Sequence, residues 1–108
     1  MIANTPPPPY YAVIFSSVRT SVDDGYVEMA ERMIELAQQQ EGFLGAESAR
    51  NNLGITVSYW QNLESITNWK KNIDHQLAQK HGREKWYAAY KVRIALVERD
   101  YGFERDVE

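Results

Sequence analysis

The chain has 108 residues, and its 12 Lys and Arg against 15 Asp and Glu give a formal net charge of −3. That length allows one domain, and a composition of 44% hydrophobic and 25% charged residues excludes a wholly disordered chain. The absence of cysteine excludes disulfides, thiolate nucleophiles, iron–sulfur clusters and cysteine-ligated zinc. The mildly acidic balance gives no reason to expect nucleic-acid binding, and no apolar stretch is long enough to span a bilayer, so we expect a cytoplasmic protein without a membrane segment.

Aromatic residues are abundant, because seven Tyr, three Trp and three Phe make up 12% of the chain. Small domains bury a smaller fraction of their surface than large domains do. This much aromatic area must therefore be buried in the core, against a partner subunit or around a ligand.

Residues 1–9 contain four consecutive prolines, Pro6–Pro9, which fix the backbone and lack amide donors. We expect an extended arm outside the sheet, either a disordered leader or a docking segment. The first strand is predicted over Tyr10–Val18, which is rich in aromatic and β-branched residues. Apolar residues occupy both of its faces, so both faces should be covered.

A helix is predicted to follow, because Ser21, Asp23 and Asp24 supply capping side chains at its start. Apolar positions recur at helical spacing as far as Gln40. We expect Gly42 to end this helix in a left-handed conformation.

Two further strands, 43–50 and 54–60, are predicted to form a hairpin around the turn sequence at Asn51–Gly54. Asn62 can cap a second helix, which we expect to be interrupted near Asn72–Asp74. A short third helix over residues 74–80 should then end at His81–Gly82, a basic residue followed by glycine.

The last strand region is predicted over Trp86–Arg99, within a domain of residues 10–103 that a charged tail of residues 104–108 follows. The order strand, helix, strand, strand, helix pair, strand is that of an α+β, ferredoxin-like split βαβ fold with a four-stranded antiparallel sheet. The helices can cover one face of this sheet, although its first and last strands are apolar on both. We therefore expect a homodimer in which a second copy covers the other face.

Catalytic patterns are scarce in the sequence, which lacks Gly-rich phosphate loops and the nucleophile elbow of hydrolases. The two histidines, His75 and His81, are six residues apart, which does not suit a metal site on one helix face, so no metal is predicted. His75 could serve as an acid or base near neutral pH, or be a capping or solvated residue. His81 fits a helix C-cap.

The tryptophans are open to more than one interpretation. Trp60 is expected to pack under the following helix, and Trp69 lies on the apolar stripe of that helix. Trp86 and Tyr87, with Tyr90, could lie at a subunit interface. Aromatics could instead wall a ligand pocket, which five polar side chains could line: Tyr59, Ser58, Asn72, Arg93 and Arg50.

A longer pattern begins with the run YWQNLESITNW at Tyr59–Trp69. It continues with these residues: His75, Ala78, Gly82–Arg83, Trp86–Tyr87 and Tyr90–Arg93. In order and spacing these segments, with Glu41–Gly45 upstream, resemble the antibiotic biosynthesis monooxygenase family over about Tyr10–Phe103.

The resemblance implies a dimeric α/β barrel and, in some members, oxygenation of small phenol- or quinol-like substrates by O₂ without metal, flavin or any other cofactor. The deprotonated substrate passes an electron to O₂, while the protein supplies a dry pocket and handles protons. By this resemblance Trp60 and Trp69 would wall the pocket. His75 would accept the proton or orient the substrate hydroxyl, and Arg93 or Arg50 could stabilise a phenolate.

A neighbouring branch of the same fold degrades haem with an Asn–Trp–His arrangement. Trp69 matches that Trp, but the haem-binding His would fall at Gln79, and the strand Tyr10–Val18 contains no Asn. Haem degradation is therefore disfavoured. Two hypotheses remain: a cofactor-independent monooxygenase for a small aromatic substrate, and a non-catalytic homodimer that binds a small molecule.

Overall fold

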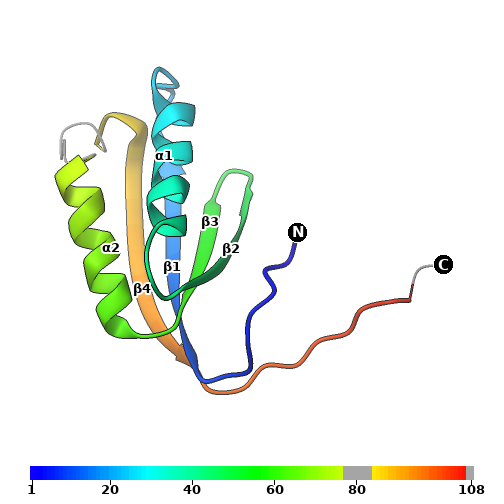
Figure 1. Cartoon of the computed structure of the whole chain (residues 1–108). Coiled ribbons are helices and arrows are strands. Elements are labelled where there is room, and N and C mark those ends of the chain that lie inside the picture. The colour runs from blue at the N-terminus through cyan, green and yellow to red at the C-terminus, as the bar shows by residue number, and fades with distance from the viewer. Residues whose placement is uncertain (77–83, 107–108) are drawn as a thin grey trace.

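The computed structural model describes residues 1–76 and 84–106, and of residues 74–76 the backbone alone. Its elements follow the predicted order (Figure 1) and are β1 (Tyr10–Arg19), α1 (Tyr26–Gln38), β2 (Phe43–Arg50), β3 (Gly54–Trp60), α2 (Leu63–Gln76) and β4 (Tyr87–Val97). Residues 84–86 form one helical turn before β4. No helix in these two described ranges is long and apolar enough to cross a membrane.

The sheet confirms the predicted α+β, ferredoxin-like architecture. Its four antiparallel strands lie in the order β2-β3-β1-β4, so β2 and β4 form the edges. Successive side chains of a strand project from opposite faces. We call the side that carries Val13 and Trp60 the helix face, because both helices pack there, and the side that carries Ile14 and Tyr59 the outer face.

The core lies between the helix face and the two helices, and Figure 1 shows α1 in front of the strands. Val13 of β1 and Trp60 of β3 form one cluster with Ala37 of α1 and Ile66 of α2, and all four side chains are buried. Three partly buried hydrophobic side chains pack against this cluster: Tyr11, Phe43 and Trp69. Trp60 thus packs under α2, as predicted.

The helix α2 runs without interruption from Leu63 to Gln76, so the predicted break near Asn72–Asp74 is wrong. An Asn favours non-helical backbone where its side chain competes for backbone groups. Here the Asn72 amide donates to the Asn68 carbonyl at 3.0 Å and to Gln40 Oε1 at 3.4 Å, so it is satisfied within the helix. The predicted third helix therefore starts inside α2, and its remainder and its end at His81–Gly82 lie outside the described residues.

The helix α1 begins and ends differently from the prediction. Its N-cap is Gly25, at a left-handed φ of 80°, and no side chain caps it. The Tyr26 N–H instead donates to the Asp23 carbonyl at 3.0 Å. The helix ends at Gln38, and Gly42, whose φ is indeed positive at 93°, lies in the turn into β2.

The N-terminal arm lies against the outer face of the sheet. The Ala3 N–H donates to the Glu47 carboxylate at 2.7 Å, and Thr5 Oγ1 donates to the Tyr10 hydroxyl at 3.1 Å. That hydroxyl donates in turn to the carboxylate of Asp100 in the C-terminal segment. These contacts join the arm to the sheet and to the C-terminal segment. Figure 1 shows the chain after β4 extending away from the body of the domain.

Candidate functional site

Two stacked indoles lie where the helix face meets α2. The ring centroids of Trp60 and Trp69 are 4.9 Å apart at an interplanar angle of 31°, and Phe43 meets Trp60 edge-on at 5.3 Å. Tyr11 lies opposite Trp60 on the neighbouring strand β1. We call these four residues the aromatic cluster.

The two indole N–H groups of the cluster have different surroundings. Trp60 Nε1 donates to Ser58 Oγ at 2.9 Å, because these side chains stand two residues apart on one face of β3. Trp69 Nε1 is buried and finds no acceptor within the described part of the chain. A buried donor without an acceptor costs about 1–3 kcal/mol, and most buried polar groups in proteins are paired. Within the described part of the chain, the Trp69 N–H therefore remains without a hydrogen-bond partner.

The helix face is only partly covered over the edge strand β4. Leu96 lies opposite Tyr11 and Val92 lies opposite Phe15, so these β4 residues belong to the helix face. Yet the large side chains on this side of β4 remain 45–53% exposed: Tyr90, Val92, Ile94 and Leu96. This β4 strip continues the aromatic cluster as an apolar surface on which an aromatic ligand could lie.

A second group of aromatic side chains closes the other end of the helix face. The Tyr87 ring lies 5.4 Å from Phe15 and 6.0 Å from Tyr26, and the Arg19 guanidinium stands 3.3 Å over the Tyr26 ring. Burial raises the pKa of the Tyr87 phenol above its usual range, and its hydrogen bond with Tyr26 adds to the effect. Tyr87 therefore supplies a neutral hydroxyl and is not a base.

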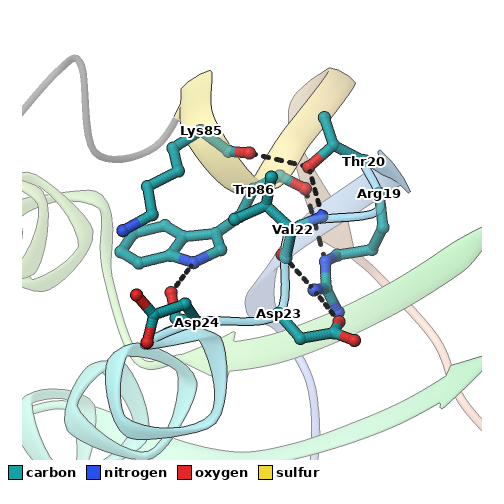
Figure 2. A network of polar contacts seen from close by, with 7 residues as sticks. All are labelled: Arg19, Thr20, Val22, Asp23, Asp24, Lys85 and Trp86. Carbon is teal, nitrogen blue, oxygen red and sulfur yellow. Dashed lines mark hydrogen bonds and ion pairs between the residues drawn. The ribbon is translucent and has the colours of Figure 1, made fainter.

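Figure 2 shows the polar network that holds this end of the molecule. The Thr20 N–H donates to the Trp86 carbonyl at 2.8 Å, and Thr20 Oγ1 donates to the Lys85 carbonyl at 2.7 Å. Arg19 Nε donates to the same Trp86 carbonyl at 3.3 Å, and Trp86 Nε1 donates to the Asp24 carbonyl at 2.7 Å. The network joins the loop after β1 to the turn before β4, and so fixes where β4 begins.

Three of the residues predicted to bind substrate lie at the same end of the helix face. Trp60 and Trp69 stack in the aromatic cluster, and Asn72 follows Trp69 by one turn of α2, half-buried against Gln40. His75, predicted as the catalytic residue, has its backbone in the last turn of α2. The structure describes the backbone of His75 but not its side chain.

Two further predicted residues lie on the opposite side of the sheet. Tyr59 pairs with Ala12 and Arg93 pairs with Ile14, so both project from the outer face. Tyr59 packs there against the Tyr10 ring at 5.7 Å. The sheet therefore separates both residues from the aromatic cluster.

Arg50 lies on the helix face but at its far end. It pairs with Gly54, six residues along β3 from Trp60, which corresponds to about 20 Å. Its guanidinium donates to the hydroxyl of Ser17, a side chain that is itself buried. Arg50 therefore belongs with the Tyr87 end of the sheet.

The aromatic residues at the start of β4 make contacts with other parts of the same chain. Tyr87 is 9% exposed and the Trp86 indole is hydrogen-bonded to Asp24, so both side chains make contacts within the chain; their subunit-interface role stays a prediction. Sequence reasoning missed Tyr26 and Arg19. No local pattern signals them, because their contacts join the end of β1, the start of α1 and the start of β4.

Two shallow hollows lie elsewhere on the surface. One is lined by Ala30, Glu31, Ile34 and Glu35 of α1, and the other by Arg99, Asp100 and Tyr101 of the C-terminal segment. Neither contains a predicted site residue. Within residues 1–76 and 84–106, no three His, Asp or Glu side chains are grouped as a metal site. The candidate site is thus the aromatic cluster with the β4 strip.

The chain has relatives among known proteins. The chain is 50% identical over 107 residues to the uncharacterized protein YqjZ of Bacillus subtilis (strain 168), which covers 97% of this chain and 94% of that protein. A crystal structure from Shewanella oneidensis matches with a TM-score of 0.69 and 10% identity, covering 92% of this chain and 98% of the other.

A structure of SnoaB, a cofactor-independent oxygenase from Streptomyces nogalater, matches with a TM-score of 0.63 and 11% identity, covering 84% of this chain and 95% of the other. At such low identity these structures show a shared fold alone. Residues 9–81 match the family model described as antibiotic biosynthesis monooxygenase. The chain therefore belongs to the antibiotic biosynthesis monooxygenase family.

Proposed function

We propose that this protein is a cofactor-independent monooxygenase that oxidises a small phenol- or quinol-like aromatic with O₂, and that it works as a homodimer. The substrate ring would lie along the β4 strip with its oxygen at the aromatic cluster. Membership of the family, some of whose members are cofactor-independent monooxygenases, supports this proposal. So does the apolar character of the β4 strip, since aromatic ligands are held mainly by apolar surface with a few polar groups.

The reaction needs no external reductant when the substrate supplies all the electrons. For an anthrone-type phenol, the ring methylene becomes a carbonyl, which removes four electrons from the substrate. O₂ accepts those four electrons, so that one oxygen atom enters the product and the other leaves with the two methylene hydrogens as water. The tasks left to the protein are to hold the substrate away from water and to move protons.

The observation that carries the proposal is the N–H of Trp69, which is buried and has no acceptor among the described residues. A phenolate oxygen placed within hydrogen-bond distance of this donor would satisfy it. The same bond would favour the ionised substrate, because donors held in a water-poor site stabilise negative charge strongly. Asn72, one turn further along α2, would hold a second substrate oxygen by exchanging its 3.4 Å bond to Gln40 for a bond to the substrate.

His75 is the proposed proton acceptor, since an imidazole is the side chain best suited in general to accept a proton in catalysis near neutral pH. Tyr59 and Arg93 are left out of the proposed site because they lie on the outer face. Arg50 is left out because it bonds Ser17 at the far end of the helix face.

The test is O₂ uptake by the Trp69→Phe variant with a panel of hydroquinones and anthrone-type phenols. Phe keeps an aromatic ring but removes the N–H, so we expect kcat to fall by about 10²–10³. Trp86→Phe is the matched control, since that indole donates to Asp24 away from the cluster, and it should retain the wild-type kcat. Equal rates for wild type and Trp69→Phe would overturn the assigned role of the indole.

A second variant separates catalysis from binding. If His75 accepts the substrate proton, His75→Ala should lower kcat by about 10²–10⁴ with little change in substrate affinity. The alternative function, a non-catalytic small-molecule-binding homodimer, predicts that the wild type binds these phenols but gives background O₂ uptake. In that case His75→Ala would alter affinity alone.

A further inference from the structure

The far end of the helix face carries a row of four paired residues that begins with a cation. Arg50 pairs with Gly54, Gly54 with Ser17, and Ser17 with Tyr90. Residues paired directly across strands project from the same face. The row therefore crosses all four strands, from Arg50 on the β2 edge to Tyr90 of the β4 strip.

The Arg50 side chain lies across this row and is fixed there. A Cβ atom on residue 54 would lie 2.1 Å from Cζ of Arg50, so the guanidinium occupies the place that a side chain at Gly54 would fill. Arg50 Nη2 donates to the hydroxyl of Ser17, and Nη1 donates to the Ser17 carbonyl at 3.5 Å. Ser17 is itself buried. The guanidinium thus crosses β3 and is held against β1.

The positive charge of Arg50 has no acidic partner among the described residues, where the ion pairs join Arg19 to Asp23 and Arg32 to Glu35. The two bonds to Ser17 use two of the five N–H donors of the guanidinium. Arg50 is exposed, so a ligand can reach the remaining three donors. Carboxylates match a guanidinium best, because they accept two parallel N–H bonds from it.

The other arginine at this end, Arg19, is engaged within the chain. Its guanidinium donates to the Trp86 carbonyl at 3.3 Å, to the Val22 carbonyl at 2.9 Å and to the Asp23 carboxylate at 2.8 Å, as Figure 2 shows. A ligand at Arg50 would therefore meet a single guanidinium. One positive charge balances a carboxylate, whereas a doubly charged phosphate would keep an unpaired negative charge.

Aromatic rings lie beside the Arg50 guanidinium. Tyr90 is 45% exposed, and its ring lies 5.4 Å from the ring of Phe15 and 5.9 Å from that of Tyr87. Since Ser17 is paired with Tyr90, the guanidinium held at Ser17 stands about 5 Å, or one strand spacing, from β4. Burial raises the pKa of the Tyr87 phenol, and the charge of Arg50 opposes that rise. The cation and an exposed aromatic ring are thus neighbours.

We infer that the far end of the helix face binds an aromatic carboxylate, with its ring on Tyr90 and its carboxylate on the Arg50 guanidinium. The fixed fork supplies parallel N–H donors, and the exposed Tyr90 ring supplies surface on which another ring can stack. This inference rests on the proposed function, because it uses the β4 strip as the ligand surface. It adds an acidic group to the ligand, at the end of the strip away from the aromatic cluster.

The test compares two probes that share a ring and differ in charge, 2-naphthoate and 2-naphthamide. Neither probe carries a phenol hydroxyl, so binding is measured apart from oxygenation. Equilibrium dialysis of the full chain at neutral pH gives both dissociation constants. We expect the wild type to bind the naphthoate about tenfold or more tightly than the amide, because hydrogen bonds between charged groups are stronger than those to a neutral group.

Three variants separate the contributions of charge, position and ring. Arg50→Met removes the charge and should make the two dissociation constants equal. Gly54→Ala keeps the charge but places a Cβ where the guanidinium lies, so the preference for the naphthoate should fall here too. Tyr90→Ala removes the ring surface and should weaken binding of both probes by a similar factor, which leaves the preference unchanged.

Arg105→Met is the matched control. It removes the same charge from the exposed C-terminal segment and should keep the wild-type preference. Circular dichroism checks that Arg50→Met still folds after losing its bonds to Ser17. If that variant does not fold, the wild type and Gly54→Ala decide the question, since both retain Arg50.

Equal binding of the two probes by the wild type, or a preference that survives in Arg50→Met, would overturn the site. Displacement of the naphthoate by an equal concentration of inorganic phosphate would overturn the aromatic acid as its ligand. The oxygenase is judged separately, by O₂ uptake. A preference for the naphthoate with background O₂ uptake would keep this site and remove the oxygenase, whereas O₂ uptake without the preference would remove this site alone.

Discussion

The two stacked indoles, Trp60 fully buried and Trp69 partly buried, differ in hydrogen bonding. Trp60 donates to Ser58, which is itself buried, whereas Trp69 donates to no described residue. Replacing either Trp by Phe removes indole atoms, and more of those atoms are buried at Trp60 than at the partly buried Trp69. At Trp60 the change also breaks a bond and leaves the Ser58 hydroxyl unpaired.

We therefore expect Trp60→Phe to reduce the free energy of unfolding by about 1 kcal/mol more than Trp69→Phe does. Urea unfolding of the ligand-free protein, followed by circular dichroism, measures both values. Equal losses would mean that the Trp69 N–H has an acceptor in solution, and the proposed ligand contact would then lose its basis.

Tyr59 makes stability depend on pH in the alkaline range. Burial raises the pKa of its phenol to about 12, and the charge of the nearby Glu47 and their hydrogen bond add to this. The unfolded chain gives up the same proton at about pH 10. Between about pH 10 and pH 12 the folded state therefore holds more protons than the unfolded state, so stability falls as pH rises through this window.

Tyr59→Phe should make this decline in stability shallower. The variant lacks the phenol proton that the folded state keeps and the unfolded state loses between about pH 10 and pH 12. The measurement is the urea midpoint at several pH values from 8 to 11.5, relative to the value at pH 8. Tyr101→Phe is the control, since that side chain is fully exposed, and it should follow the wild-type curve. If Tyr59→Phe also followed the wild-type curve, burial of this phenol would be contradicted.

At the scale of elements, the start of α1 depends on one glycine. Gly25 has a φ of 80°, and a Cβ atom there would lie 3.2 Å from Cζ2 of Trp86. An L-residue in the left-handed region costs about 1–2 kcal/mol. The Trp86 ring is fixed by its bond to Asp24, so it has little freedom to move away.

We expect Gly25→Ala to lower the free energy of unfolding by at least about 1–2 kcal/mol. Gly102→Ala, where a Cβ would meet nothing within 4 Å, should leave stability unchanged. Chemical unfolding of both variants provides the comparison. A Gly25→Ala variant as stable as the wild type would show that α1 can start with another cap.

The elements also show what could be predicted from the sequence. The bounds of β2 and β3 match the prediction because alternation and the Asn51–Gly54 turn are local signals. The break in α2 was wrong because Asn72 is satisfied by Gln40, a residue 32 positions earlier. The opposite faces of Tyr59 and Trp60 follow from strand alternation alone. The position of Arg93 required the β1–β4 register, which no local pattern reveals.

At the scale of the whole molecule, the two faces of the sheet carry different groups. The helix face holds the aromatic cluster and the β4 strip, whereas the outer face carries Glu47, Tyr59 and Arg93. Oxygenation and dimerisation would thus use opposite sides of the same strands. Variants on one face should leave the property of the other face unchanged, apart from effects on folding.

The most direct test of the proposed chemistry is oxidation of an anthrone-type phenol under ¹⁸O₂ with purified protein, a metal chelator and no added flavin or nicotinamide. We predict that O₂ uptake and product formation proceed in equal amounts, with one ¹⁸O atom in the product and the other in water. O₂ uptake at background, although the same phenol binds saturably, would contradict the oxygenase and leave a binding protein in its place.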